Sequence, residues 1–169
     1  MNPRCFLVAT LIATLSLIEA NGAPSPSSPG HPTLLSPHSD PIAVHQGKVF
    51  VVNTPADTLD VIDTATEQIV TRIPTGIDPV SVSVRPDGKE VWVSNHISDS
   101  VSVIDNHSEN ATYLSVIATI QDIDLEKKST RFNEPVGIAF ANNTKAYVAL
   151  SSSNQIAVVD VAARRVTKY

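Results

Sequence analysis

A sequence repeat that occurs three times is the feature that most constrains the fold of this chain. One unit appears as VFVVN (49–53), VWVSN (91–95) and AYVAL (146–150), and a second unit follows it as TLDVID (58–63), SVSVID (100–105) and QIAVVD (155–160). The period is 42 residues from Phe50 to Trp92 and 55 residues from Trp92 to Tyr147. Periods of this order are typical of solenoids and propellers, in which each repeat is one supersecondary unit that needs its neighbours to bury its core.

Each period contains short extended runs of strand-forming residues. The second copy has them at residues 79–84, 90–94 and 100–104, and the first copy adds a fourth at residues 68–73. Valine alternates with serine in the first of these runs, and small serines let a second sheet approach, so we expect both faces to be covered. Four antiparallel strands in each repeat are typical of a propeller blade. The predicted fold class is all-β: a β-propeller of four-stranded antiparallel blades, with about three blades present in an incomplete ring.

Two segments of different composition precede the repeats. Residues 1–22 carry one positive charge, then an apolar run and small residues; this pattern predicts a secretory signal peptide cleaved after Ala20 or Gly22, a retained membrane anchor being the alternative. Residues 23–41 hold six prolines with serines between them, and they are predicted to be an extended linker. We therefore expect a secreted, periplasmic or cell-surface protein.

The remaining chain, residues 42–169, divides into predicted blades at approximately 42–78, 79–134 and 135–169. The formal net charge of −5 argues against a nucleic-acid binder, which needs a basic surface. The single cysteine, Cys5, excludes a disulfide framework and a cysteine-rich zinc site.

The repeat resembles the YVTN repeat of bacterial and archaeal propellers, which also occurs in surface-layer-like and lactonase-like propellers and is WD40-like in architecture. The motifs that carry the resemblance are VFVVN (49–53), TLDVIDTAT (58–66), TRIPTGIDP (71–79), VSVRPDGKEVWVSN (82–95), SVSVIDN (100–106) and PVGIAF (135–140). The third copy departs from the pattern by placing Leu150 where the first two have Asn53 and Asn95. The resemblance implies a ring of about seven blades, within the general range for propellers. We expect the remaining blades to come from a longer chain, self-assembly of open arcs being the less favoured alternative.

The resemblance also implies where a partner would bind. In such blades the loops that join strands two and three, and those that join one blade to the next, leave the same face. Here that face would gather residues 53–57, 95–99 and 151–154, together with the insertion 121–134 that lengthens the second period. The candidate ligand or partner contacts are Asn53, Asn95, His96, Asp122, Asp124, Glu126, Lys127, Lys128 and Arg131. The alternative interpretation is that the insertion is a solvent-exposed surface loop of mixed charge.

The motifs of common enzyme and cofactor sites are absent from the sequence. It contains no GxSxG, HExxH, P-loop, GxGxxG or CxxCH motif, so we predict no catalytic residue, metal or cofactor. Asp63, Asp105 and Asp160 end the third strand of each copy and are predicted to cap turns.

The expected function is that of an exported binding scaffold for a protein, polymer or surface partner, with the membrane contacted only through the signal peptide. The alternative is that the chain belongs to a larger lactonase-like or quinoprotein-like enzyme, or to a propeller fused to a c-type cytochrome, whose active site lies outside it.

Overall fold

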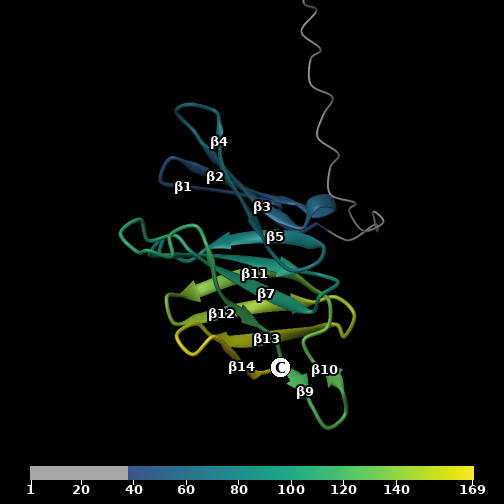
Figure 1. Ribbon diagram of the computed structural model, residues 1–169. Coiled ribbons are helices and arrows are strands. Elements are labelled where there is room, and N and C mark those ends of the chain that lie inside the picture. Colours follow the sequence, from purple (N-terminus) through teal and green to yellow (C-terminus); the bar gives the residue numbers. More distant parts are fainter. Residues whose placement is uncertain (1–37) are drawn as a thin grey trace, which may run out of the picture.

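The computed structural model describes residues 38–169. The predicted signal peptide and most of the predicted linker lie outside the described residues. The described chain folds into three four-stranded antiparallel sheets stacked one after another (Figure 1). The strands are β1 (Ile42–His45), β2 (Lys48–Asn53), β3 (Thr58–Asp63) and β4 (Ile69–Pro74) in blade 1; β5 (Pro79–Val84), β6 (Glu90–Asn95), β7 (Ser100–Asp105) and β8 (Val116–Ile120) in blade 2; and β11 (Pro135–Asn142), β12 (Lys145–Leu150), β13 (Gln155–Asp160) and β14 (Arg165–Lys168) in blade 3.

Each sheet is a simple meander in which consecutive strands are neighbours, as propeller blades require. The sheets do not close into a ring within the described residues. The predicted fold class, an incomplete propeller of about three blades, is therefore confirmed. Two short elements interrupt the pattern: a 3-10 turn, η1 (Thr54–Ala56), and a hairpin of β9 (Ile123–Asp124) and β10 (Ser129–Thr130) inside the insertion.

The first strand of each blade lies toward the middle of the arc, because β5 contacts both β1 and β11. Residues 38–41, which precede β1, form hydrogen bonds with both blade 1 and blade 2. His38 Nε2 lies 2.9 Å from Thr54 Oγ1 in blade 1, and the backbone N–H of Val82 in blade 2 donates to Asp40 O at 2.8 Å. Residues 38–41 thus form a strap along the inner edge of the arc.

The core consists of two seams between blades. In the first seam Phe50, Leu59 and Val61 of blade 1 pack with Val91 and Ile104 of blade 2. In the second seam Trp92, Val101 and Val103 of blade 2 pack with Val148 and Val159 of blade 3. All of these side chains are fully buried, and full burial of such a residue stabilises a fold by about 1.5–3 kcal/mol.

Blade 2 is covered on both faces, as the valine–serine alternation predicted. Val80 and Val82 are buried on one side of β5, and Ser81 is buried on the other. In β6 and β7 every residue is buried. The buried positions Ser81, Ser94 and Ser102 carry small side chains, which permit the close approach of the neighbouring blades.

The predicted turn-capping aspartates occupy that role. Asp63 Oδ1 accepts hydrogen bonds from the backbone of Ala65 and Thr66, and Asp160 Oδ1 accepts one from Ala163 N at 2.8 Å. Asp105, which is almost fully buried, accepts three: from His107 N at 2.9 Å, Asn110 Nδ2 at 2.9 Å and Thr112 Oγ1 at 2.6 Å. The third strand of each blade therefore ends in the same way.

Substituting Asp105 with asparagine is expected to flatten the acid dependence of stability. Burial raises the pKa of Asp105, but the hydrogen bonds from Thr112, His107 and Asn110 outweigh it, and the net pKa lies below the usual value. A lowered folded-state pKa means that the stabilisation is complete above the unfolded pKa of about 4 and is lost as the pH falls through the folded value. Urea unfolding of wild type and Asp105→Asn at pH 7, 5 and 3 measures this. The variant should be less stable at pH 7 and lose less on acidification; equal losses would show that Asp105 does not contribute.

None of the helices within residues 38–169 has the length and apolar character needed to cross a bilayer.

Candidate functional site

The loops at one end of the three blades are joined to one another by hydrogen bonds. We call this end, made of residues 53–57, 75–78, 95–99, 121–134 and 151–154, the loop face; it lies at the right of Figure 1. Between blades 1 and 2, the Thr75 backbone N–H donates to Asp57 O at 2.9 Å and the Ile77 N–H donates to Ser98 Oγ at 2.9 Å. Between blades 2 and 3, Gln121 Nε2 donates to Ser98 O at 3.2 Å and Ser151 N donates to Glu134 O at 3.0 Å. The segments predicted to share a face do so.

At the loop face, an aspartate of one blade accepts a hydrogen bond from the residue that directly precedes the next blade. Asp57 and Asp99 occupy the left-handed backbone region, with φ of 55° and 47°, immediately before the third strand of their blades. Asp57 Oδ1 accepts the backbone N–H of Asp78 at 2.8 Å, and Asp99 Oδ1 accepts that of Glu134 at 2.8 Å. Asp78 and Glu134 directly precede β5 and β11. Aspartate and asparagine tolerate this backbone region better than most residues, and Asn154 holds the same position in blade 3 with φ of 51°.

The two candidate asparagines occupy different environments. Asn53 is half-buried at the end of β2. Asn95 is fully buried, and its Nδ2 donates to Ser100 Oγ at 3.0 Å and to Ser102 Oγ at 2.9 Å. The structure thus places the Asn95 side chain inside blade 2 and not on the open surface of the loop face.

His96 lies next to Glu134 and largely below the surface. Its Nε2 is 3.9 Å from Glu134 Oε2, and its Nδ1 is buried without a hydrogen-bond partner among the described residues. Ser151 Oγ donates to the same Glu134 Oε2 at 3.2 Å. Glu134, which was not among the predicted residues, therefore joins His96 of blade 2 to Ser151 of blade 3. Its position before a blade, equivalent to that of Asp78, is the sequence signal that identifies it.

The charged residues of the insertion largely bind one another. Asp122 Oδ2 accepts Arg131 Nη2 at 2.9 Å and the Tyr169 hydroxyl at 2.6 Å, and the Arg131 guanidinium lies 5.3 Å from the centre of the Tyr169 ring. The phenol is partly buried and donates to a carboxylate, and both effects raise the pKa of Tyr169. These contacts hold the base of the hairpin against the end of blade 3.

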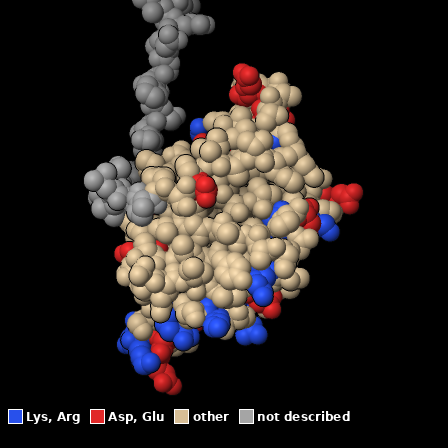
Figure 2. Space-filling model, turned by 180° about the vertical axis from the view of Figure 1, so that it is seen from behind, with Lys and Arg blue, Asp and Glu red and all other residues tan. Residues whose placement is uncertain are grey.

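The tip of the hairpin is shaped by Asp124. Its Oδ1 accepts the backbone N–H groups of Lys127 and Glu126, and its Oδ2 lies 3.2 Å from Lys127 Nζ. These hydrogen bonds hold the pKa of Asp124 below its usual value, and the one from the Lys127 backbone has the largest effect. Lys128 is exposed in the left-handed region with φ of 50°. Figure 2 shows charged side chains of both signs gathered at the lower left, over this hairpin, while the middle of that view is largely uncharged.

Phe132 anchors the insertion. It is fully buried in the second seam, in the cluster that contains Trp92 and Ile120. At the other end of the hairpin Leu125 is 82% exposed. Two further apolar side chains, Ile77 and Ile97, are exposed on loops that contact one another through Ser98. The loop face therefore presents separate exposed apolar side chains among polar ones. Single apolar residues in loops give no periodic signal, so the sequence pattern does not identify these three residues as part of the loop face.

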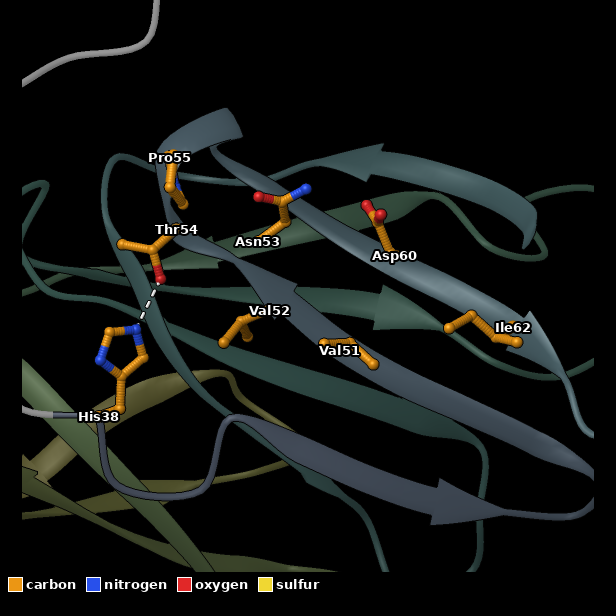
Figure 3. A pocket seen from close by; sticks show the side chains of 8 residues that line it. All are labelled: His38, Val51, Val52, Asn53, Thr54, Pro55, Asp60 and Ile62. Carbon is orange, nitrogen blue, oxygen red and sulfur yellow. Dashed lines mark hydrogen bonds between the residues drawn. The ribbon is translucent and has the colours of Figure 1, made fainter. Parts of the chain in front are cut away.

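A pocket of about 330 Å³ opens on the outer side of blade 1, beside the loop face (Figure 3). Its apolar wall comes from β2 and β3, and the His38 ring points toward Thr54 at its edge. The lining residues are His38, Val51, Val52, Asn53, Thr54, Pro55, Asp60 and Ile62. Of the candidate residues, only Asn53 lines it. Residues 38–169 contain no group of three or more His, Cys, Asp or Glu side chains arranged to hold a metal ion.

Comparison with known proteins agrees with this architecture. A family model described as YNCE-like beta-propeller matches residues 6–136. No match was found among curated proteins. A solved structure similar to the chain is hydrazine synthase of Kuenenia stuttgartiensis, with 26% identity and a TM-score of 0.59 over 72% of this chain and 32% of that one.

Two other solved structures share the fold. Dihydro-heme d1 dehydrogenase NirN is 18% identical, with a TM-score of 0.53 over 68% of this chain and 23% of its own. The WD40 β-propeller domain of Doa1 is 13% identical, with a TM-score of 0.55 over 75% of this chain and 37% of its own. The chain thus spans about a third or less of the hydrazine synthase and NirN chains.

Proposed function

This chain belongs to the YNCE-like beta-propeller family, and from that premise we propose that it is an exported propeller module that binds a protein through its loop face. The observation that carries the proposal is the construction of that face. Backbone and side-chain hydrogen bonds connect the loops of all three blades, so the face is a single ordered platform. Binding surfaces on loops that a rigid scaffold positions are a common arrangement.

The exposed apolar side chains of the loop face are the proposed anchors. Leu125, Ile77 and Ile97 project from three different loops. Protein interfaces combine such apolar anchors with a polar rim, and the rim here includes Lys127 and Lys128. The sequence of residues 1–22, which has the pattern of a signal peptide, is the basis for proposing export.

Affinity capture from the extracytoplasmic fraction of the source organism tests this function. The bait is the chain, and the comparison bait is Leu125→Asp combined with Ile97→Asp, which leaves the seams intact because both side chains are exposed. A matched control is Val116→Asp, which is also exposed but lies on β8, outside the loop face. The proposal expects proteins that the wild type and the control retain and the loop-face variant loses. Equal retention by all three baits would contradict it.

A second candidate is that the chain is part of a larger redox enzyme. The observation that favours it is that the similar structures include a hydrazine synthase and a dihydro-heme d1 dehydrogenase, the second of which is by name a redox enzyme, and that this chain spans a minor part of each. The reacting groups would then come from polypeptide outside the described residues. Haem absorbance in the captured complex, or in a longer product of the same gene, would favour this candidate over a pure binding module.

A further inference from the structure

A polar pocket of about 300 Å³ lies between blades 2 and 3 at the end opposite the loop face, which is the left side of Figure 1. Its walls come from the β5–β6 hairpin, the end of β7 with the loop that follows it, strand β8 and the β13–β14 turn. The lining residues are Arg85, Lys89, Glu90, Asp105, His107, Asn110, Ile117 and Arg164. All of these walls belong to two neighbouring blades within the described residues, so the pocket does not depend on any blade outside them.

Both carboxylates in the lining are already engaged by donors of the protein. Glu90 Oε1 lies 3.1 Å from both Arg85 Nη1 and Arg164 Nη2. The other oxygen, Oε2, accepts a hydrogen bond from Trp92 Nε1 at 2.8 Å. Asp105 accepts the three hydrogen bonds from its own loop that are described above. Because these carboxylates are satisfied within the fold, the pocket does not favour a cation.

The polar groups that remain in the pocket are donors. Lys89 is exposed, and its ammonium group forms no ion pair or hydrogen bond with another side chain of residues 38–169. Arg164 is a third exposed and uses Nη2 on Glu90, while a guanidinium carries five N–H donors in all. The Asn110 amide nitrogen carries two hydrogens and gives one of them to Asp105. Three side chains of the lining therefore have donors to spare.

The formal charge of the lining is positive in a chain that is acidic as a whole. Three basic and two acidic side chains line the pocket, which leaves +1 with histidine neutral, whereas the whole chain carries −5. Asp87 lies outside the lining, where Arg85 binds it through Nε at 2.7 Å and Nη2 at 2.8 Å. The hydrogen bond from Arg85 is the largest cause of the lowered pKa of Asp87, and the charge of Lys89 is the smallest. The ammonium group of Lys89 is therefore left for another anion.

The spare donors come from both sides of the seam between blades 2 and 3. Lys89 lies beside the loop that contains Asn110, because Asn106 N donates to Lys89 O at 2.9 Å. Arg164 reaches across from the β13–β14 turn of blade 3 to Glu90 of blade 2. An acceptor held by all three donor side chains would therefore join the two blades.

We propose that this pocket binds a small oxyanion, a phosphate or a carboxylate group, through Lys89, Asn110 and Arg164. An oxyanion accepts several hydrogen bonds at once, and bonds between charged partners are the stronger ones. The pocket and the loop face lie at opposite ends of the blades, so an anion and a protein partner can be bound at the same time. Anion binding is therefore independent of the function proposed above, and either proposal can fail without the other.

Titration of the full 169-residue chain with inorganic phosphate, followed by ¹H–¹⁵N NMR, tests the proposal. Sodium chloride keeps the ionic strength constant, so that general screening does not change during the titration. Saturable shifts are expected for the backbone amides of Lys89, His107, Asn110 and Arg164. A parallel titration with acetate distinguishes the two kinds of oxyanion: saturation with both identifies a general oxyanion site, and saturation with one alone identifies a site for that group.

Two variants and a control test the assigned residues. Lys89→Gln removes one charge from an exposed side chain and should weaken phosphate binding about three- to fivefold. Lys89→Gln combined with Arg164→Gln should abolish saturation. Lys128→Gln, also exposed but in the hairpin of the loop face, is the matched control and should bind as the wild type does. The dispersion of the amide signals shows whether each variant is folded, and Lys89→Gln alone decides the test if the double variant is not.

Three results would overturn the proposal. The first is a shift of the pocket amides that does not saturate with phosphate or with acetate. The second is saturation confined to residues outside the pocket. The third is an equal dissociation constant for the wild type and Lys89→Gln.

Discussion

Substituting Phe132 with alanine is expected to destabilise the chain by about 3–5 kcal/mol, the usual range for removing a buried phenylalanine. Phe132 is fully buried in the second seam, in one cluster with Trp92 and Ile120. Among the described residues, its side chain is the only one of the insertion 121–134 that belongs to a core cluster. The substitution therefore leaves a cavity and also releases the insertion from the blades. Urea unfolding followed by circular dichroism gives the free energy.

Two further variants separate packing from general damage. Phe132→Leu keeps most of the apolar volume and should lose clearly less stability than Phe132→Ala, which keeps the test informative if the alanine variant does not fold. Leu125→Ala, in the same hairpin but 82% exposed, should change stability by less than about 0.5 kcal/mol. Limited trypsin digestion at Lys127 and Lys128 should be faster in Phe132→Ala. A stability loss under about 1 kcal/mol would mean that the insertion does not depend on this anchor.

Substituting Glu90 with glutamine is expected to cost about 2 kcal/mol, although the two side chains have the same shape. The buried Glu90 carboxylate accepts Trp92 Nε1 at 2.8 Å through Oε2, and its Oε1 lies 3.1 Å from both Arg85 Nη1 and Arg164 Nη2. Every one of these groups is a donor. Whichever way a glutamine amide is turned, its NH₂ group faces a donor, so one hydrogen bond becomes a repulsive contact.

The loss of stability expected for Glu90→Gln is smaller than that for breaking a fully buried ion pair, for two reasons. Arg164 is a third exposed, so water partly replaces the lost carboxylate, and Arg85 keeps its contact with Asp87 at 2.7 Å. Glu109→Gln, at an exposed residue of the same blade, is the control and should be neutral within about 0.5 kcal/mol. Urea unfolding of both variants at pH 7 measures the difference, and equal stabilities would show that the carboxylate charge contributes nothing to the seam.

The blades were predictable from the sequence because their signals are local. The run predicted at 79–84 is β5 without change, and those at 90–94 and 100–104 gain one residue each, Asn95 and Asp105. The fourth strand of blade 1 shifts by one residue to Ile69–Pro74. Val–Ser alternation and a turn between strands suffice to define such elements.

The loop face was predictable in position but not in detail. The repeat defines which loops share an end, yet it does not say which side chains point outward. Asn95 is the last residue of β6, a strand in which every residue is buried, whereas His96 begins the loop that follows. Phe132 lies alone in a polar stretch, where no period reveals it as core. The contact of Glu90 with Arg164 joins residues 74 positions apart, and no short motif predicts such a distant pair.

The aspartates Asp57 and Asp99, which bind the residue before the next blade, explain how this architecture tolerates insertions. Residues 75–78 connect β4 to β5, and residues 121–134 connect β8 to β11. Both connections, one more than three times as long as the other, end in the same hydrogen bond from the residue before the new blade to the aspartate of the old one. This hydrogen bond therefore fixes the residue at which the next blade begins, whatever the length or course of the connection that precedes it. The segment that connects two blades can therefore be exchanged, in evolution or in an engineered variant, without moving the blade that follows it.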